Sequence, residues 1–234
     1  MENLLVAFDL DDTLYKECDF VMSGYRAVAR AVAQESGVFD YDEMVDVMVN
    51  APVNAFDSLQ EYITNRAEQY AIICKIGIPE MVSIYRTHFP DIKSEESLAV
   101  LNDLQACGFR LAIITDGRKV TQSNKIKALG LDAIVPAANI SISEAIGAEK
   151  FLPLPFERMM RLNPDIERFI YIGDNPMKDF VWPNRLGWTT IQLNDDGRNI
   201  HSQEINLPSN DYTPHYRITT LTDLQPLLTT LPPK

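Results

Sequence analysis

The chain has 234 residues, of which 46% are hydrophobic and 23% are charged, proportions typical of a folded globular protein rather than a disordered one. Acidic residues outnumber basic ones by 33 to 21, so the net charge is −12. This charge argues against a nucleic-acid partner, which requires clustered Lys and Arg. It also means that an anionic substrate needs a cation or local positive groups to hold it.

The cysteines and the N-terminal segment bear on location. Cys18, Cys74 and Cys107 are odd in number and share no CxxC spacing, which is typical of free thiols in a reducing compartment. The apolar run Leu4–Phe8 is too short for a signal peptide or a membrane span. We therefore expect a cytoplasmic protein without a membrane partner, and the net charge favours a monomer.

Apolar runs without alternation predict strands that are buried on both faces of a parallel sheet. The clearest runs are Leu4–Phe8, 110–114 and 169–172, with shorter candidates at 133–135 and 189–193. Helical patterns separate them, at residues 97–107, 119–129, 154–162 and 177–186. Strands that alternate with helices predict an α/β fold with a doubly wound parallel sheet. Residues 194–214 predict a loop, and residues 218–228 a short strand and a helix.

The segment from about 19 to 88 breaks this alternation. Its apolar residues, such as Tyr25, Val28 and Val32, recur at helical spacing, and no strand pattern interrupts them. We predict an insertion of four helices. The domain division that follows is a catalytic core of residues 1–16 and 92–234 and an all-helical domain of residues 17–91.

Polar residues follow three of the predicted strands. Asp9 and Asp11 follow the first, Thr115 ends the second, and Asp174 follows another. Open α/β sheets bind ligands beyond the carboxyl ends of their strands. Two carboxylates facing one pocket repel each other unless a cation or a proton lies between them, and hard divalent cations prefer oxygen ligands. Asp9, Asp11 and Asp174 are thus a candidate magnesium site.

Each acidic residue also has a structural interpretation. An Asp after a strand is commonly a helix N-cap or an Asx-turn, which applies to Asp12, and Asp174-Asn175-Pro176 is a typical helix start. However, three predicted strands each end in residues that suit the same reaction. This coincidence favours a catalytic role for the acids over a purely structural one.

The sequence resembles the haloacid dehalogenase superfamily of phosphohydrolases over essentially its whole length. The four short motifs of that superfamily are matched in order by Asp9, Asp11 and Thr13 (DxDx[TV]), by Thr115, by Lys150, and by Gly173, Asp174 and Asp179 (GDxxxxD). The resemblance implies a Rossmann-like core with a helical cap inserted between the first two motifs. In one departure, Phe151 follows Lys150 where relatives usually have Pro, which puts the position of Lys150 in question.

The resemblance also implies a mechanism. Asp9 is expected to be the nucleophile that forms an aspartyl-phosphate, and Asp11 the general acid and base, a role that needs a raised pKa. Mg2+ would be held by Asp9, the main-chain carbonyl of Asp11, and Asp174. The remaining expected roles are phosphoryl binding by Thr115 and the amides near Leu10, Asp116 and Gly117, positive charge from Lys150, and orientation of Lys150 or of a metal-bound water by Asp179.

The expected substrate is a small phosphomonoester, such as a sugar phosphate or a nucleotide. Asp11 and Thr13 favour phosphatase over dehalogenase chemistry, because a halide leaves without protonation. Tyr15, a candidate substrate contact, could equally be hinge packing, and Cys18, Arg26 and Lys75 are further candidates near or in the cap. Phosphoglucomutase-like transfer and a non-catalytic binding role remain alternatives. A phosphonate hydrolase would need a Schiff-base Lys, for which only Lys75 is available.

Overall fold

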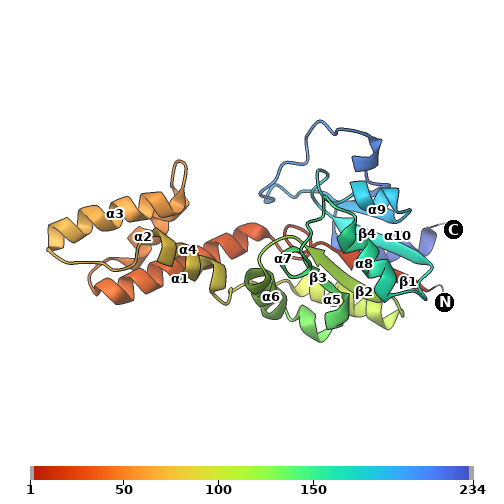
Figure 1. The fold of residues 1–234 in the computed structure, drawn as a ribbon, viewed down its shortest axis with the longest axis horizontal. Helices are drawn as coiled ribbons and strands as arrows, with labels where there is room; N and C mark the ends of the chain where they lie inside the picture. Colours follow the sequence, from red (N-terminus) through yellow and green to blue (C-terminus); the bar gives the residue numbers. More distant parts are fainter. Residues whose placement is uncertain (1–2, 232–234) are drawn as a thin grey trace. The chain divides into compact units, whose positions relative to one another are not determined.

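A computed structural model describes residues 3–231, which form two compact units. The core unit contains the residues up to Cys18 and those from Ile92 onward, and the helical unit is Asp19–Asp91. Figure 1 shows the elements of both units along the chain. None of the helices within residues 3–231 combines the length and apolar character that a membrane span requires.

The core unit contains one parallel sheet in the order β3-β2-β1-β4-β5-β6. Its strands are β1 (Leu4–Phe8), β2 (Arg110–Thr115), β3 (Ile140–Ile142), β4 (Arg168–Gly173), β5 (Thr189–Leu193) and β6 (Tyr216–Ile218). Every residue of β1 and β4 is buried, which explains why these runs show no alternation of apolar and polar residues. The predicted α/β fold with a doubly wound parallel sheet is confirmed.

The strand order reverses at the centre of the sheet. The chain runs from β1 through β2 to β3 on one side, and then returns to place β4 against the other side of β1. Phe8, at the end of β1, is level with Ile113 of β2 and Ile172 of β4. The polar residues that follow these three strands therefore reach the same edge, at the point where such sheets bind ligands.

The α-helices of the core unit after the insertion are α5 (Glu95–Ala106), α6 (Lys119–Ala128), α7 (Ser143–Ile146), α8 (Leu154–Leu162), α9 (Val181–Arg185) and α10 (Leu224–Thr230). Two sequence predictions differ from the structure here. The strand expected at 133–135 is wrong, because Leu131–Ala133 is a 3-10 turn and the strand follows at Ile140–Ile142. A three-residue apolar run has no period that separates a strand from a buried turn.

The helix expected over 177–186 covers only Val181–Arg185. The preceding residues form a turn instead, in which the Asp179 carboxylate accepts a hydrogen bond from the Asn175 backbone N–H at 2.8 Å. A side chain that satisfies a nearby backbone donor competes with helix formation.

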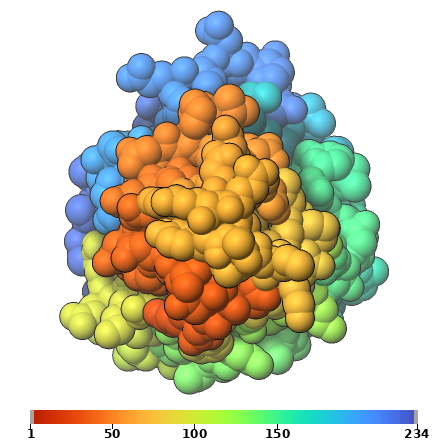
Figure 2. Space-filling model, turned by 90° about the vertical axis from the view of Figure 1, so that its left-hand side faces the viewer, coloured from red at the N-terminus to blue at the C-terminus, as the bar shows by residue number. Residues whose placement is uncertain are grey.

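The helical unit is built from α1 (Glu17–Ser36), whose first residues belong to the core unit, α2 (Tyr41–Val49), α3 (Ala55–Tyr70) and α4 (Ile78–Thr87). The number agrees with the four helices predicted. Asp40 and Asn54 accept backbone hydrogen bonds at the starts of α2 and α3, as N-caps do. The helices pack around a buried cluster that includes Val28, Met44, Leu59 and Met81. Figure 2 shows one face of this unit in orange and gold.

Gly24 of α1 provides a test of this packing. A Cβ atom at Gly24 would overlap the ring of Tyr85 in α4. Ala is favoured over Gly inside a helix by about 1 kcal/mol, whereas overpacking costs about 1–3 kcal/mol. We expect Gly24→Ala to lower the free energy of unfolding, measured in urea, while Arg30→Ala on the exposed side of α1 does not. A Gly24→Ala protein that is more stable than wild type would show that the Tyr85 ring can move aside without loss of stability.

Candidate active site

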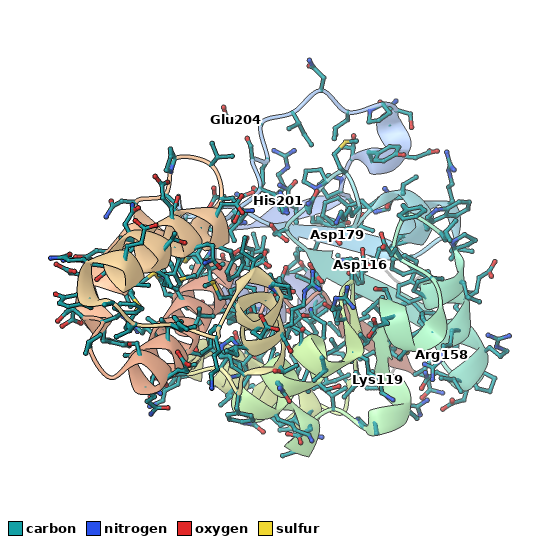
Figure 3. All side chains as sticks on the ribbon, turned by 60° about the vertical axis from the view of Figure 1, so that its left-hand side comes forward. Asp116, Lys119, Arg158, Asp179, His201 and Glu204 are labelled. Carbon is teal, nitrogen blue, oxygen red and sulfur yellow. The ribbon has the colours of Figure 1, made fainter. Side chains whose placement is uncertain are left out.

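The carboxyl ends of β1, β2 and β4 place Asp9, Thr115 and Asp174 around one cavity of about 130 Å3 in the core unit. All three residues are buried, and the Asp9 backbone N–H donates to the Ile172 carbonyl of β4 at 2.8 Å. The cavity is lined by Asp9, Asp11, Asp12, Glu17, Thr115, Asp116, Lys150, Asp174, Asn175, Lys178 and His201. Figure 3 labels Asp116 and His201 of this lining.

Lys150 joins two of the acids. Its Nζ lies 2.8 Å from Asp9 Oδ1 and 2.6 Å from Asp179 Oδ1, and all three side chains are buried. The Lys150 backbone N–H donates to Asp116 Oδ1 at 3.0 Å, so the main chain is held as well. The Phe151 side chain is 55% exposed. The absence of Pro at 151 therefore does not move the Lys150 charge away from Asp9.

Asp179 is fully buried and accepts hydrogen bonds from Lys150 and from the Asn175 backbone. Gly173 makes this position possible, because a Cβ atom at Gly173 would overlap the Asp179 carboxylate. The glycine that precedes Asp179 by six residues in the GDxxxxD motif is thus required for a steric reason. Asp179 thus pairs with Lys150 in the folded core.

Asp9, Asp174 and Asp179 each offer a carboxylate oxygen within 4.8 Å of the others, close enough to hold one metal ion. Burial, together with the neighbouring carboxylates, raises the pKa of Asp9 to about 8 and that of Asp174 to about 9. Crowded acids that resist ionisation are the donor set that a hard divalent cation stabilises. Both Asp179 oxygens have partners, since Oδ1 pairs with Lys150 and Oδ2 accepts the Asn175 N–H, whereas the pair of Asp9 with Lys150 uses only Oδ1. Asp9 and Asp174 are therefore the carboxylates best placed to coordinate the ion.

The Asp11 side chain has a different environment. Its carboxylate accepts hydrogen bonds from Lys125 Nζ at 2.6 Å, from Gln122 Nε2 at 2.7 Å and from the Tyr15 hydroxyl. Burial alone would raise the pKa of Asp11, but the Lys125 charge and these hydrogen bonds outweigh it, so the pKa is lowered. The raised pKa expected from the sequence is therefore not what these surroundings produce.

Sequence reasoning missed Gln122 and Lys125. Both are buried on α6 and lie three residues apart, so they share one face of the helix. Gln122 also donates to Thr115 Oγ1 at 2.7 Å, which links the end of β2 to Asp11. Their spacing could have identified them as site residues, because both are long polar side chains on one face of the helix that follows Thr115.

Leu10, whose amide was expected to bind the phosphoryl group, and Thr13, a candidate substrate-binding residue of the first motif, are buried next to Asp9 and Asp11 in the chain. The Thr13 hydroxyl is buried and has no hydrogen-bond partner among the described residues. The Gly117 backbone N–H already donates to Ser143 Oγ at 2.9 Å, so this amide is committed within the fold.

A loop after β5 also reaches the site, which the sequence did not suggest. Asn199 Nδ2 donates to Asp174 Oδ2 at 2.9 Å, and the Ile200 N–H donates to Asp12 Oδ2 at 2.8 Å. Lys16 anchors the same loop through an ion pair of 2.9 Å with Asp196. The loop brings His201 into the cavity lining.

Buried acids and lysines thus gather at the switch point of a parallel α/β sheet, where such sheets bind their ligands. The family model for haloacid dehalogenase-like hydrolases matches residues 6–192, and the chain belongs to this family. The glyceraldehyde 3-phosphate phosphatase of Methanopyrus kandleri is 28% identical over 230 residues, covering 91% of each chain. That of Methanocaldococcus jannaschii is 23% identical, covering 80% of this chain and 83% of its own.

Solved structures show the same fold. A HAD-hydrolase from Bacillus subtilis bound to magnesium is similar with a TM-score of 0.62 at 17% identity, covering 97% of this chain and 99% of its own. A 2-haloacid dehalogenase from Pseudomonas syringae gives a TM-score of 0.60 at 21% identity, covering 98% and 99%.

The buried ion pair predicts a stability effect of Lys150→Met, which keeps the volume of the side chain but leaves Asp9 and Asp179 facing each other. Breaking a buried ion pair costs about 3–5 kcal/mol, whereas an exposed substitution changes little. We expect a loss of that size in urea unfolding at neutral pH with chelator present, and almost none for the exposed Lys127→Met. Equal stability of the two variants would contradict the structural role of Lys150.

Proposed function

We propose that this protein is a magnesium-dependent phosphatase that hydrolyses a small phosphomonoester through an aspartyl-phosphate on Asp9. The observation that carries the proposal is the buried Asp9 carboxylate, held 2.8 Å from Lys150 and beside Asp174 in one cavity. The phosphatase names of the relatives support it. Residues 1–16 and 92–234 are the proposed catalytic domain, and residues 17–91 the proposed cap.

In the first step, an Asp9 oxygen bonds to phosphorus while the bond from phosphorus to the leaving oxygen breaks, and Asp11 protonates that oxygen. In the second step, water attacks the phosphorus, Asp11 takes its proton, and the bond to Asp9 breaks. Lys150 and Thr115 stabilise the phosphoryl group. Asp9, Asp174 and the main-chain carbonyl of Asp11 would hold Mg2+, which when bound neutralises the phosphoryl oxygens.

Substrate and cation adjust the protonation that this mechanism needs. A cation bound by Asp9 and Asp174 would favour their ionised forms, the form in which Asp9 acts as a nucleophile. A phosphoryl dianion beside Asp11 disfavours the Asp11 carboxylate and opposes the Lys125 charge that keeps its pKa low. Asp11 can then carry a proton when the leaving group needs one.

The proposed substrate is a small sugar phosphate. The cavity of about 130 Å3 is well below the roughly 300–1,000 Å3 of sites for drug-sized ligands. The relatives named for glyceraldehyde 3-phosphate support a three-carbon ester in particular.

The activity test is phosphate release from a panel of phosphomonoesters, first with Mg2+ and then with chelator. We expect chelator-sensitive release, and a loss of at least about 1,000-fold in kcat for Asp9→Asn because an amide cannot form the acyl-phosphate. The exposed Asp132→Asn is the matched control and should retain the wild-type rate. Substantial activity of Asp9→Asn, with its circular dichroism unchanged, would contradict the nucleophile assignment.

The raised pKa values predict how stability depends on pH. Since the folded pKa values of Asp9 and Asp174, about 8 and about 9, exceed the unfolded values near 4, the folded protein binds more protons over that window. The metal-free protein should therefore lose stability as the pH rises from about 4 to 9. Mg2+ binds the ionised carboxylates, so its stabilising effect should grow with pH.

Thermal melting at pH 5, 7 and 9, with chelator or with Mg2+, checks this prediction. Asp174→Asn should show a shallower pH dependence and a smaller shift with Mg2+. A wild-type shift with Mg2+ that is the same at every pH would show that these carboxylates do not bind the ion.

A further inference from the structure

Glu17 and His201 are among the cavity-lining side chains that take no part in the proposed phosphoryl chemistry. Glu17 stands at the start of α1 and is half-buried, and His201 lies on the loop after β5 and is exposed. They are 184 positions apart in the chain, yet they line the same cavity as Asp9. Figure 3 shows His201 on its loop, with Glu204 further along it.

Asp12 fixes the backbone next to both residues. Its Oδ1 accepts the Glu17 N–H at 2.9 Å, and its Oδ2 accepts the N–H of Ile200, the residue before His201, at 2.8 Å. Asp12 is buried and has a positive φ of 55°, a conformation that is rare for a residue with a side chain and is often found at functional sites. One carboxylate thus ties together the two segments that carry Glu17 and His201.

The loop is held on both sides of His201. Asn199 donates to the Asp174 carboxylate at 2.9 Å, and Gln203 Nε2 donates to the Asp174 carbonyl at 2.9 Å. Lys16 donates to Asn199 Oδ1 at 2.7 Å. His201 is therefore presented to the cavity by a backbone that is fixed to the proposed metal-binding edge.

From this geometry we infer that Glu17 and His201 recognise the leaving group of the substrate and select a neutral, hydroxylated one. The inference rests on the proposed function, whose residues occupy the phosphoryl end of the cavity. A carboxylate accepts a hydrogen bond from a hydroxyl group, and an imidazole donates or accepts one. Burial and the charge of Asp11 raise the pKa of Glu17 to about 7. Above that pH, at which the test below is run, Glu17 is ionised and disfavours leaving groups that carry a carboxylate.

The test compares three phosphomonoesters with Mg2+ present: glycerol 3-phosphate with a hydroxylated leaving group, phenyl phosphate without such hydroxyls, and phosphoglycolate with a carboxylate. The variants are Glu17→Gln and His201→Ala in the full chain. Glu204→Gln, on the same loop but exposed and outside the cavity lining, is the matched control.

We expect the ratio of kcat/KM for glycerol 3-phosphate to that for phenyl phosphate to fall about tenfold in both variants, the size of one lost hydrogen bond. In Glu17→Gln, kcat/KM for phosphoglycolate should rise about tenfold relative to glycerol 3-phosphate. Glu204→Gln should change each ratio by less than about twofold.

Unchanged ratios, or equal losses on all three esters, would overturn the inference and leave the proposed function standing. A wild-type protein that releases no phosphate from these three esters, and none from any member of the wider panel, would contradict the proposed function and the inference together.

Discussion

The ion pairs that Lys150 makes with Asp9 and Asp179 are the interaction on which the site depends. The three residues come from the loop before α8, from the end of β1 and from the turn after β4. Charges removed from water are costly unless they are paired, so each of these side chains requires the others to be in place. Gly173 provides the space that Asp179 needs. The catalytic chemistry that we propose is in this way coupled to the stability of the core unit.

The same burial leaves an excess of negative charge. Lys150 compensates part of it, while the raised pKa values of Asp9 and Asp174 show that the remainder calls for a proton or a divalent cation. Asp11, two residues from Asp9, is instead stabilised as a carboxylate by Lys125 and Gln122. Neighbouring acids with separated pKa values are typical of sites that divide nucleophilic and acid–base roles. In the protein without ligand, Asp11 ionises at a lower pH than Asp9. A bound cation and substrate would reverse this order, since the cation favours ionised Asp9 and the phosphoryl group favours protonated Asp11.

Much of the core was predictable because parallel strands buried on both faces are continuous apolar runs. Leu4–Phe8 was predicted with its full length, and the four helices of the insertion followed from apolar spacing. The errors lie where a local pattern is short or where a side chain competes with the backbone. The apolar residues at 133–135 belong to a turn, and Asp179 closes a turn where a helix was expected.

The sequence by itself determined the fold class and the set of acids at the strand ends, because strand periodicity and motif spacing are local properties of the chain. The tertiary structure alone decided which groups surround those acids. Lys125 reaches Asp11 across 114 residues of sequence, and Ile200 reaches Asp12 across 188. The pKa of each acid, and the side chains that meet the leaving group, depend on such long-range contacts. No local pattern encodes them, because they arise only when the sheet brings its strand ends together.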